Sequence, residues 1–209
     1  MEPVLVGYFP RHPAPAPPGL LQRGVAEIGN LGHYGSDGPK NWVDQWRHNQ
    51  MWFYDSEEVV RKVIADAIEI HIEPDPERDP PWQVRLTHEN GVGFDFYAYK
   101  LFPVSFTEGK QEPFELPFLN VTPLARDYEW LGYDAVNKTC CAQFECSPLF
   151  CNGMCEEIPV NRWCLIDERE RAFEVANYFS VRKPEPGAYF VVEVWRKTRT
   201  RSQPKPRKA

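Results

Sequence analysis

The sequence predicts an α+β protein with a mixed or mainly antiparallel sheet of roughly five to seven strands. Two main helices are expected on one face of the sheet, and a Cys-rich loop is expected as an insertion at its edge. Short runs rich in β-branched and aromatic residues indicate the strands, and two longer stretches with apolar residues at helical spacing indicate the helices. With 209 residues, 42% of them apolar and 14% aromatic, the chain can bury one core.

The first part of the chain is expected to alternate short strands and helices. Strands are predicted over residues 4–9, 50–54 and 68–72, and short helices over residues 20–28 and from Asn41. A longer helix is expected to begin at Asp55, because Asp55 and Glu58 have the spacing of a capping box. Residues 10–19 contain five prolines and predict an extended surface segment.

The second part predicts one hairpin, one long helix and a strong final strand. Residues 82–86 and 93–106 are expected to pair with each other, because the turn between them contains Asn90-Gly91. Further strands are predicted over residues 116–121, 162–166 and 187–196. The second main helix is predicted over residues 167–179, where Asp167 and Glu170 repeat the capping-box spacing.

The charge of the chain is unevenly distributed. Residues 196–209 contain seven of the 24 basic residues and no acid, so 17 basic residues stand against 30 acidic residues in the body. We therefore expect one domain over residues 1–196, which includes the Cys-rich segment 137–164, and a basic disordered tail over residues 197–209. No apolar run has the length of a membrane span, and no export signal is recognised, so a cytoplasmic protein with reduced thiols and no membrane contact is expected.

All six cysteines fall within 25 consecutive residues. They are Cys140, Cys141, Cys146, Cys151, Cys155 and Cys164. Zinc requires four tetrahedral ligands, often thiolates in pairs separated by two to four residues. The predicted structural zinc ligands are Cys146, Cys151, Cys155 and Cys164, with Cys141 or a distant His as a substitute for any one of them. Free reduced cysteines, disulfides and a catalytic thiol remain alternatives, whereas the spacings match neither common ferredoxin pattern.

The case for zinc depends on how few apolar residues the Cys-rich segment contains. Residues 137–161 include only six large apolar side chains. Ordering each residue costs on the order of 1–2 kcal/mol of backbone entropy. A bound zinc ion can supply about 10 kcal/mol of binding free energy to such a segment.

Three functional hypotheses follow from these features. The first is a non-enzymatic, cytosolic binding or regulatory protein, whose zinc-stabilised loop contacts a macromolecular partner, and whose acidic body suits a basic protein. The second is an enzyme that uses a cluster cysteine or an open zinc site together with His48, which lies between Trp46 and Trp52. The third is association with nucleic acid through residues 196–209. No catalytic residue is predicted, and the sequence favours a protein without enzymatic activity.

Overall fold

The computed structural model describes residues 1–11, 15–31, 53–65, 68–74, 82–88, 95–138 and 144–198. For residues 63–65, 68–74, 82–88 and 144–146 it describes the backbone alone. The helix predicted from Asn41 and the candidate residue His48 lie outside the described residues, as does the end of the basic tail, residues 199–209.

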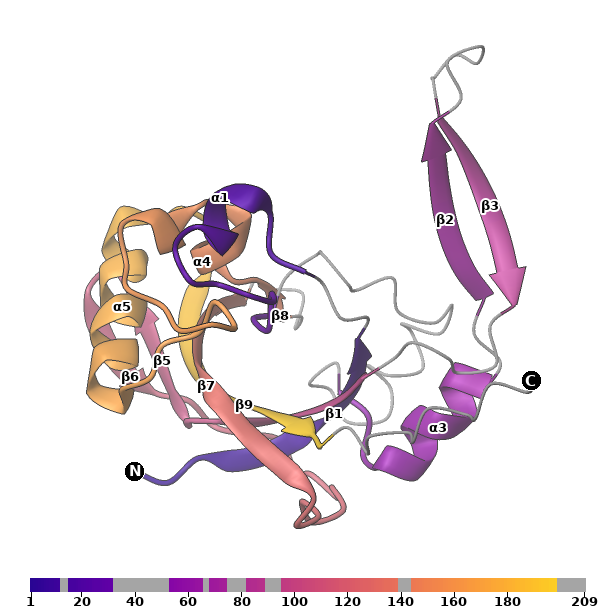
Figure 1. Ribbon diagram of the computed structural model, residues 1–209. Helices are drawn as coiled ribbons and strands as arrows, with labels where there is room; N and C mark the ends of the chain where they lie inside the picture. The colour runs from indigo at the N-terminus through magenta and orange to yellow at the C-terminus, as the bar shows by residue number, and fades with distance from the viewer. Residues whose placement is uncertain are drawn as a thin grey trace, which may run out of the picture.

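The fold is organised around the last strand, β9 (Ala188–Lys197). One edge of β9 pairs along its whole length with β7 (Tyr128–Lys138). Its other edge pairs with β4 (Asp95–Leu101) and, near its beginning, with β5 (Val104–Thr107). All of these pairings are antiparallel, so β9 is the centre of the sheet (Figure 1).

Three further strands complete this sheet among the described residues. β1 (Val4–Arg11) pairs with β4, β6 (Lys110–Pro113) pairs with β5, and β8 (Phe144–Cys146) pairs with the end of β7. The prediction of an α+β fold with a mainly antiparallel sheet is confirmed. The predicted strands over residues 4–9 and 187–196 correspond to β1 and β9.

The sheet is buried on both faces at β9, and helices pack on one of them. Tyr189 and Val191 lie in a core with α5 (Arg169–Arg182), whereas Phe190 and Val192 face a second core on the opposite side. On α5, the residues buried in that core share one stripe, as expected for an amphipathic helix. They are Ala172, Val175, Ala176 and Phe179.

The other helices are shorter. α3 (Glu57–Ala65) places Val60 against Tyr8 and Ala98. It begins one residue later than a capping box at Asp55 would give, because the hydroxyl of Ser56 accepts the hydrogen bond from the N–H of Val59. α1 (Pro18–Leu21), α4 (Pro148–Cys151) and η1 (Met154–Glu156) are single turns. Figure 1 shows α1, α4 and α5 gathered at the same end of the sheet.

The predicted hairpin is wrong in its pairing. β3 (Trp82–His88) pairs with β2 (Ile68–Pro74) in a separate two-stranded sheet, and β4 pairs with β1 and β9 instead. An Asn-Gly turn is a local signal, whereas β4 has buried residues on both of its faces, so it needs a strand on each side and packing above and below. Partners distant in the sequence therefore determine where β4 lies.

Two other predicted strands are absent from the described residues, and one predicted helix is shorter than expected. Residues 162–166 form a turn, in which only Ile166 bridges to Tyr133, and residues 116–121 form no strand. The helix expected over residues 20–28 is limited to α1. The strand expected over residues 50–54 lies mostly outside the described residues, and its described end, Tyr54, makes an isolated bridge to Tyr8. Conversely, β7 was not predicted.

The expected Cys-rich insertion at the sheet edge is not confirmed. Leu149, Met154 and Ile158 lie in the same core as α5 and the sheet. The segment follows the outer edge of β7 and pairs with it through β8. Just after the segment, Ile166 forms reciprocal backbone hydrogen bonds with Tyr133 on β7, both 2.8 Å long. The Cys-rich segment is therefore an integral part of the domain and satisfies an otherwise open strand edge.

Gly132 allows this segment to approach β7 closely. It follows a β-bulge at Leu131 and has a φ of 148°. A Cβ atom at this position would lie 2.8 Å from the Cβ of Leu165 and 3.0 Å from the carbonyl oxygen of Ile166. Because one of these neighbours is backbone, little local movement can relieve the clash.

We predict that Gly132→Ala lowers the free energy of unfolding by roughly 2–4 kcal/mol, through strain and overpacking. Urea denaturation followed by tryptophan fluorescence measures the change. Gly19→Ala is the control, because a Cβ atom there meets no heavy atom within 4 Å. If both variants were as stable as the unmodified protein, the close approach at Gly132 would be contradicted.

Candidate functional site: a thiol pair beside a pocket

Two of the predicted metal ligands, Cys155 and Cys164, come into contact. Cys155 belongs to η1, and Cys164 lies in the turn before α5. The two side chains lie in the same core and shift each other's pKa, both are free thiols, and they are 2% and 0% exposed. The fold thus assembles a buried pair of thiols from two turns.

Asn161 holds the turn that carries Cys164. Its side-chain oxygen accepts hydrogen bonds from the N–H groups of Trp163 at 2.9 Å and Leu165 at 3.1 Å. Its amide nitrogen donates to the carbonyl of Leu131 on β7 at 2.8 Å. These bonds stabilise Cys164 at a φ of 59°, a conformation that residues other than glycine rarely adopt.

Gly153 directs Cys155 toward Cys164. It has a φ of 67° and separates α4 from η1. Its N–H donates to the carbonyl of Phe150 at 3.0 Å, and its own carbonyl accepts from the N–H of Glu156 at 2.9 Å. Glycine adopts this left-handed conformation without a steric penalty, so the chain can reverse between the two short helices.

The contact makes the two thiols chemically unequal. The hydrogen bond from Cys164 lowers the pKa of Cys155 to about 7, against the effect of burial, and the positive charge of Arg23 acts in the same direction. The same hydrogen bond, together with burial, raises the pKa of Cys164. Cys155 is therefore the thiolate of the pair, and Cys164 retains its proton.

A pocket of about 290 Å³ opens beside Cys155. The residues that line it come from α1 and from the Cys-rich segment. They are Pro17, Gly19, Leu20, Arg23, Phe150, Gly153, Cys155 and Glu156. The guanidinium of Arg23 donates a 2.7 Å hydrogen bond to the carbonyl oxygen of Glu156, which fixes the cation next to η1. A small molecule in this pocket would meet both a thiolate and a positive charge.

The other two predicted ligands do not join this pair in the described residues. Cys151, at the end of α4, is exposed and disulfide-bonded, and the side chain of Cys146 is outside the described part. Within the described part of the chain, no group of three or more His, Cys, Asp or Glu side chains is arranged to hold a metal ion. Zinc binding by the four predicted cysteines therefore stays a prediction.

A buried carboxylate connects the beginning of α4 to β7. Asp134 accepts a 2.6 Å hydrogen bond from the hydroxyl of Ser147 and another of 2.6 Å from the N–H of Leu31. Ser147 also accepts a 3.1 Å hydrogen bond from Asn30, and Asn30, Asp134 and Ser147 are fully buried. Although Ser147 is at the N-cap position of α4, its hydroxyl binds Asp134 instead of capping the helix.

Sequence reasoning missed Asp134 and Arg23. An acidic residue between Tyr133 and Ala135, in the middle of a strand, is unusual, because a buried charge needs specific partners. That signal was lost because β7 was not predicted. Nothing in the sequence near Arg23 indicates that it contacts Glu156, which is 133 positions away.

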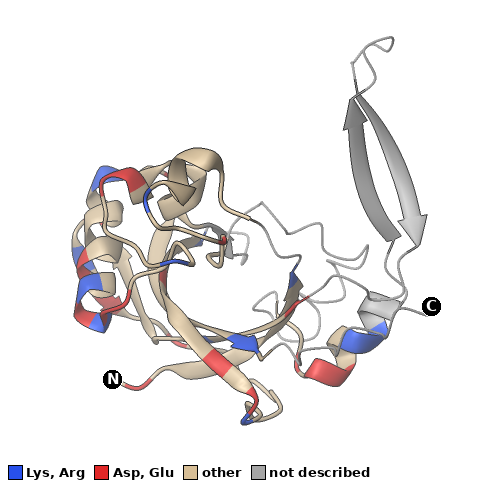
Figure 2. Ribbon diagram, in the orientation of Figure 1, with Lys and Arg blue, Asp and Glu red and all other residues tan. Residues whose placement is uncertain are grey.

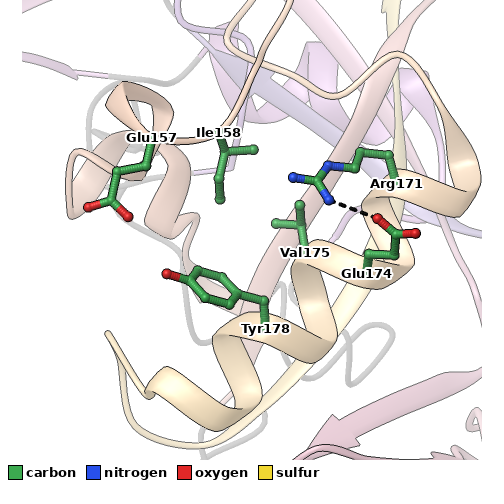
Figure 3. Close-up of a pocket in the computed structure, with 6 residues that line it drawn as sticks. All are labelled: Glu157, Ile158, Arg171, Glu174, Val175 and Tyr178. Carbon is green, nitrogen blue, oxygen red and sulfur yellow. Dashed lines mark hydrogen bonds and ion pairs between the residues drawn. The ribbon is translucent and has the colours of Figure 1, made fainter.

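A second pocket lies between η1 and α5 and has a volume of about 220 Å³ (Figure 3). Its charged side chains are paired: Arg171 contacts Glu174 at 2.8 Å, and Glu157 contacts Arg182 at 3.0 Å. Figure 2 shows that charged residues of both signs occur along α5. Because these charges satisfy one another and none of the described residues that line this pocket is a cysteine, it carries a weaker functional signal than the pocket at Cys155.

The beginning of the predicted basic tail is part of the fold. Lys197 is the last residue of β9 and forms two ion pairs, both 2.7 Å long, with Glu57 and Asp127. Arg196 is paired with Glu27 and Glu129. These two basic residues are thus engaged within the domain, and nucleic-acid binding by residues 196–209 remains a prediction.

The chain matches no protein-family model, no curated protein and no solved structure. Among the residues that the structure describes, no helix is both long and apolar enough to cross a membrane. The geometry of the thiol pair and its pocket must therefore carry the functional argument.

The buried carboxyl of Asp134 predicts a pH-dependent stability. Burial raises its pKa from 3.8 to about 7, so the folded chain retains a proton that the unfolded chain releases. The stability that this group contributes is thus fully present below about pH 4 and is lost as the pH rises through about 7. Neighbouring Arg11 and Cys164 both have raised pKa values and keep their protons over this range.

We predict that Asp134→Asn reduces the loss of stability between pH 5 and pH 8 by on the order of 2–4 kcal/mol. Denaturant unfolding at several pH values measures how the free energy of unfolding changes with pH. This slope does not depend on any destabilisation by the substitution that is the same at every pH. The control is Glu115→Gln, at an exposed position. An unchanged slope in Asp134→Asn would show that the carboxyl titrates normally.

Proposed function

We propose that this protein is a thiol-based redox protein in which Cys155 and Cys164 interconvert between a dithiol and a disulfide. The supporting observation is that two free thiols are buried in the same core and shift each other's pKa, and that one of them lines a pocket. Vicinal thiols of this kind favour exchange, because a second thiol can resolve a mixed disulfide formed on the first.

The proposed reaction is exchange with a low-molecular-weight disulfide. The thiolate of Cys155 attacks one sulfur, the S–S bond of the substrate breaks, and one thiolate leaves with the electron pair. Cys164 then gives its proton to the departed thiolate, and its sulfur attacks that of Cys155, which expels the second thiolate. Starting from the Cys155 thiolate, the protein loses two electrons and one proton in total, and the substrate disulfide becomes one thiol and one thiolate.

A regulatory role agrees with the position of the pair. Cys155 and Cys164 lie in the core that joins the Cys-rich segment, α5 and the segment that contains α1. A covalent bond between them would constrain η1 against the turn before α5, next to the pocket. In this proposal, the oxidation state of the pair controls the surface offered to a partner, consistent with the binding or regulatory protein expected from the sequence.

A structural zinc site is the second candidate. It is favoured by one observation: the fold brings two of the four predicted ligands, Cys155 and Cys164, together from residues nine positions apart. Thiolates on one zinc ion would also be neighbours. Cys146 and Cys151 would then complete the site, provided that the disulfide of Cys151 is first reduced, and zinc would stabilise the segment without taking part in exchange.

We predict that the reduced protein reacts with dithiodipyridine, an uncharged disulfide, to form an internal disulfide. Cys155→Ser removes the attacking thiolate and should slow this reaction by about 100-fold or more, because a hydroxyl does not replace it. Cys164→Ser keeps the attack but lacks the resolving thiol, so it should accumulate a stable mixed disulfide on Cys155. Stopped-flow absorbance and intact mass spectrometry measure the two effects.

Elemental analysis separates the two candidates. If the reduced protein contained one zinc ion per chain, and Cys155 were unreactive until a chelator was added, the structural zinc site would be supported and the redox proposal contradicted. Metal-free protein that forms the internal disulfide would support the redox proposal. The redox proposal would also be contradicted if Cys155→Ser and Cys164→Ser both reacted like the unmodified protein.

A further inference from the structure

The pocket beside Cys155 contains a cation without a carboxylate partner in the described structure. Arg23 uses one N–H group to bind the carbonyl oxygen of Glu156, which is uncharged. Among the residues that the structure describes, no acid forms an ion pair with Arg23. The remaining N–H groups of its guanidinium are donors that suit the planar, bidentate geometry of a carboxylate.

The other walls of the pocket are apolar and restrict its size. Leu20, which is 8% exposed, and Phe150 belong to the core around the thiol pair, and both line the pocket. A volume of about 290 Å³ is at the lower end of the range for small-molecule sites. The pocket therefore suits a molecule of about the size of two linked amino acids, rather than a folded protein.

We propose that this pocket binds small disulfides that carry a carboxylate group, with Arg23 holding the carboxylate while Cys155 attacks the disulfide. This inference depends on the exchange reaction proposed above and names its substrate class. Arg23 acts as a binding residue: it pairs with the anionic end of the substrate and orients the S–S bond toward the sulfur of Cys155. The electron and proton balance is that of the exchange already described.

Among the described residues that line this pocket, Glu156 is the one acid, and its charge is opposite to that of Arg23. Its carbonyl oxygen accepts the hydrogen bond from Arg23, whereas its carboxylate forms no ion pair with Arg23 among the described residues. Arg23 and Glu156 therefore place opposite charges at the pocket that Cys155 lines. Removing the charge of Arg23 and removing the charge of Glu156 should therefore change the preference for a charged reagent in opposite directions.

The test compares three reagents of different charge: dithiobis(nitrobenzoate), which carries two carboxylates; dithiodipyridine, which is uncharged; and cystamine, which carries two ammonium groups. Rate constants are measured at low ionic strength and divided by those of mercaptoethanol, an uncharged thiol, to remove intrinsic differences. The rate assigned to Cys155 is the part that Cys155→Ser abolishes.

The unmodified protein should prefer the anionic over the cationic reagent by about tenfold. Arg23→Gln should reduce this preference to about twofold or less, and Glu156→Gln should increase it. Arg23→Lys should retain most of it, because the charge is conserved while the bidentate geometry is lost. Added salt should weaken the preference in the unmodified protein and leave Arg23→Gln nearly unaffected.

The outcomes distinguish this inference from the proposed function. If Cys155 of the unmodified protein exchanges with the uncharged reagent but shows no preference for the anionic one, the substrate class is wrong and the redox proposal stands. If the preference persists in Arg23→Gln, Arg23 is not the binding residue. If Cys155 reacts with none of the three reagents, the redox proposal itself fails. A circular dichroism spectrum of each variant, together with the activity of Arg23→Lys, separates these results from misfolding.

Discussion

The open edge of β7 is the constraint on which the rest of this structure depends. β9 saturates one side of β7, and the backbone groups on the other side must find partners, because unsatisfied polar groups in a core are costly. The Cys-rich segment supplies them at one end through β8, and Ile166, two residues after the segment, supplies them at the other. Asp134 and Asn161 add side-chain anchors to the same edge.

This edge contact explains why the thiols meet. Ser147 is fixed to Asp134 at the start of α4, and Asn161 is fixed to the carbonyl of Leu131 before the turn at Cys164. The chain between these anchors has to fold back on itself, and Gly153 provides the reversal. Cys155 and Cys164 are thus brought together by the requirements of a strand edge, and the pocket forms where α1 packs against the reversal.

Part of this fold could be predicted from the sequence, and the reasons are local. β1, β9, α3 and α5 carry strong periodic patterns of apolar residues, and their predicted positions are close to the observed ones. β7 lacks such a pattern, because Gly132 and Asp134 interrupt its apolar residues for the sake of contacts elsewhere. The pairing of β4 depends on partners distant in the sequence, so a turn signal could not determine it.

In the candidate site, too, local sequence features could be predicted, whereas long-range contacts could not. The density of cysteines indicated Cys155 and Cys164 as candidate site residues, but their spacing alone could not show that these two would pair. Arg23 is unremarkable in the sequence, and only the packing of α1 places it beside η1. Residues that act through long-range contacts were therefore missed, whereas residues of an unusual type in a dense cluster were found.

The most direct test of this account starts from metal-free protein in which Cys155 and Cys164 are reduced and the disulfide of Cys151 is intact. This protein is treated with one equivalent of dithiodipyridine, and the new disulfide is identified. Digestion under acidic conditions, followed by mass spectrometry, identifies the linked peptides. The account predicts a linkage between Cys155 and Cys164 as the main product. A main product that joins either of them to a different cysteine, or leaves both as free thiols, would contradict it.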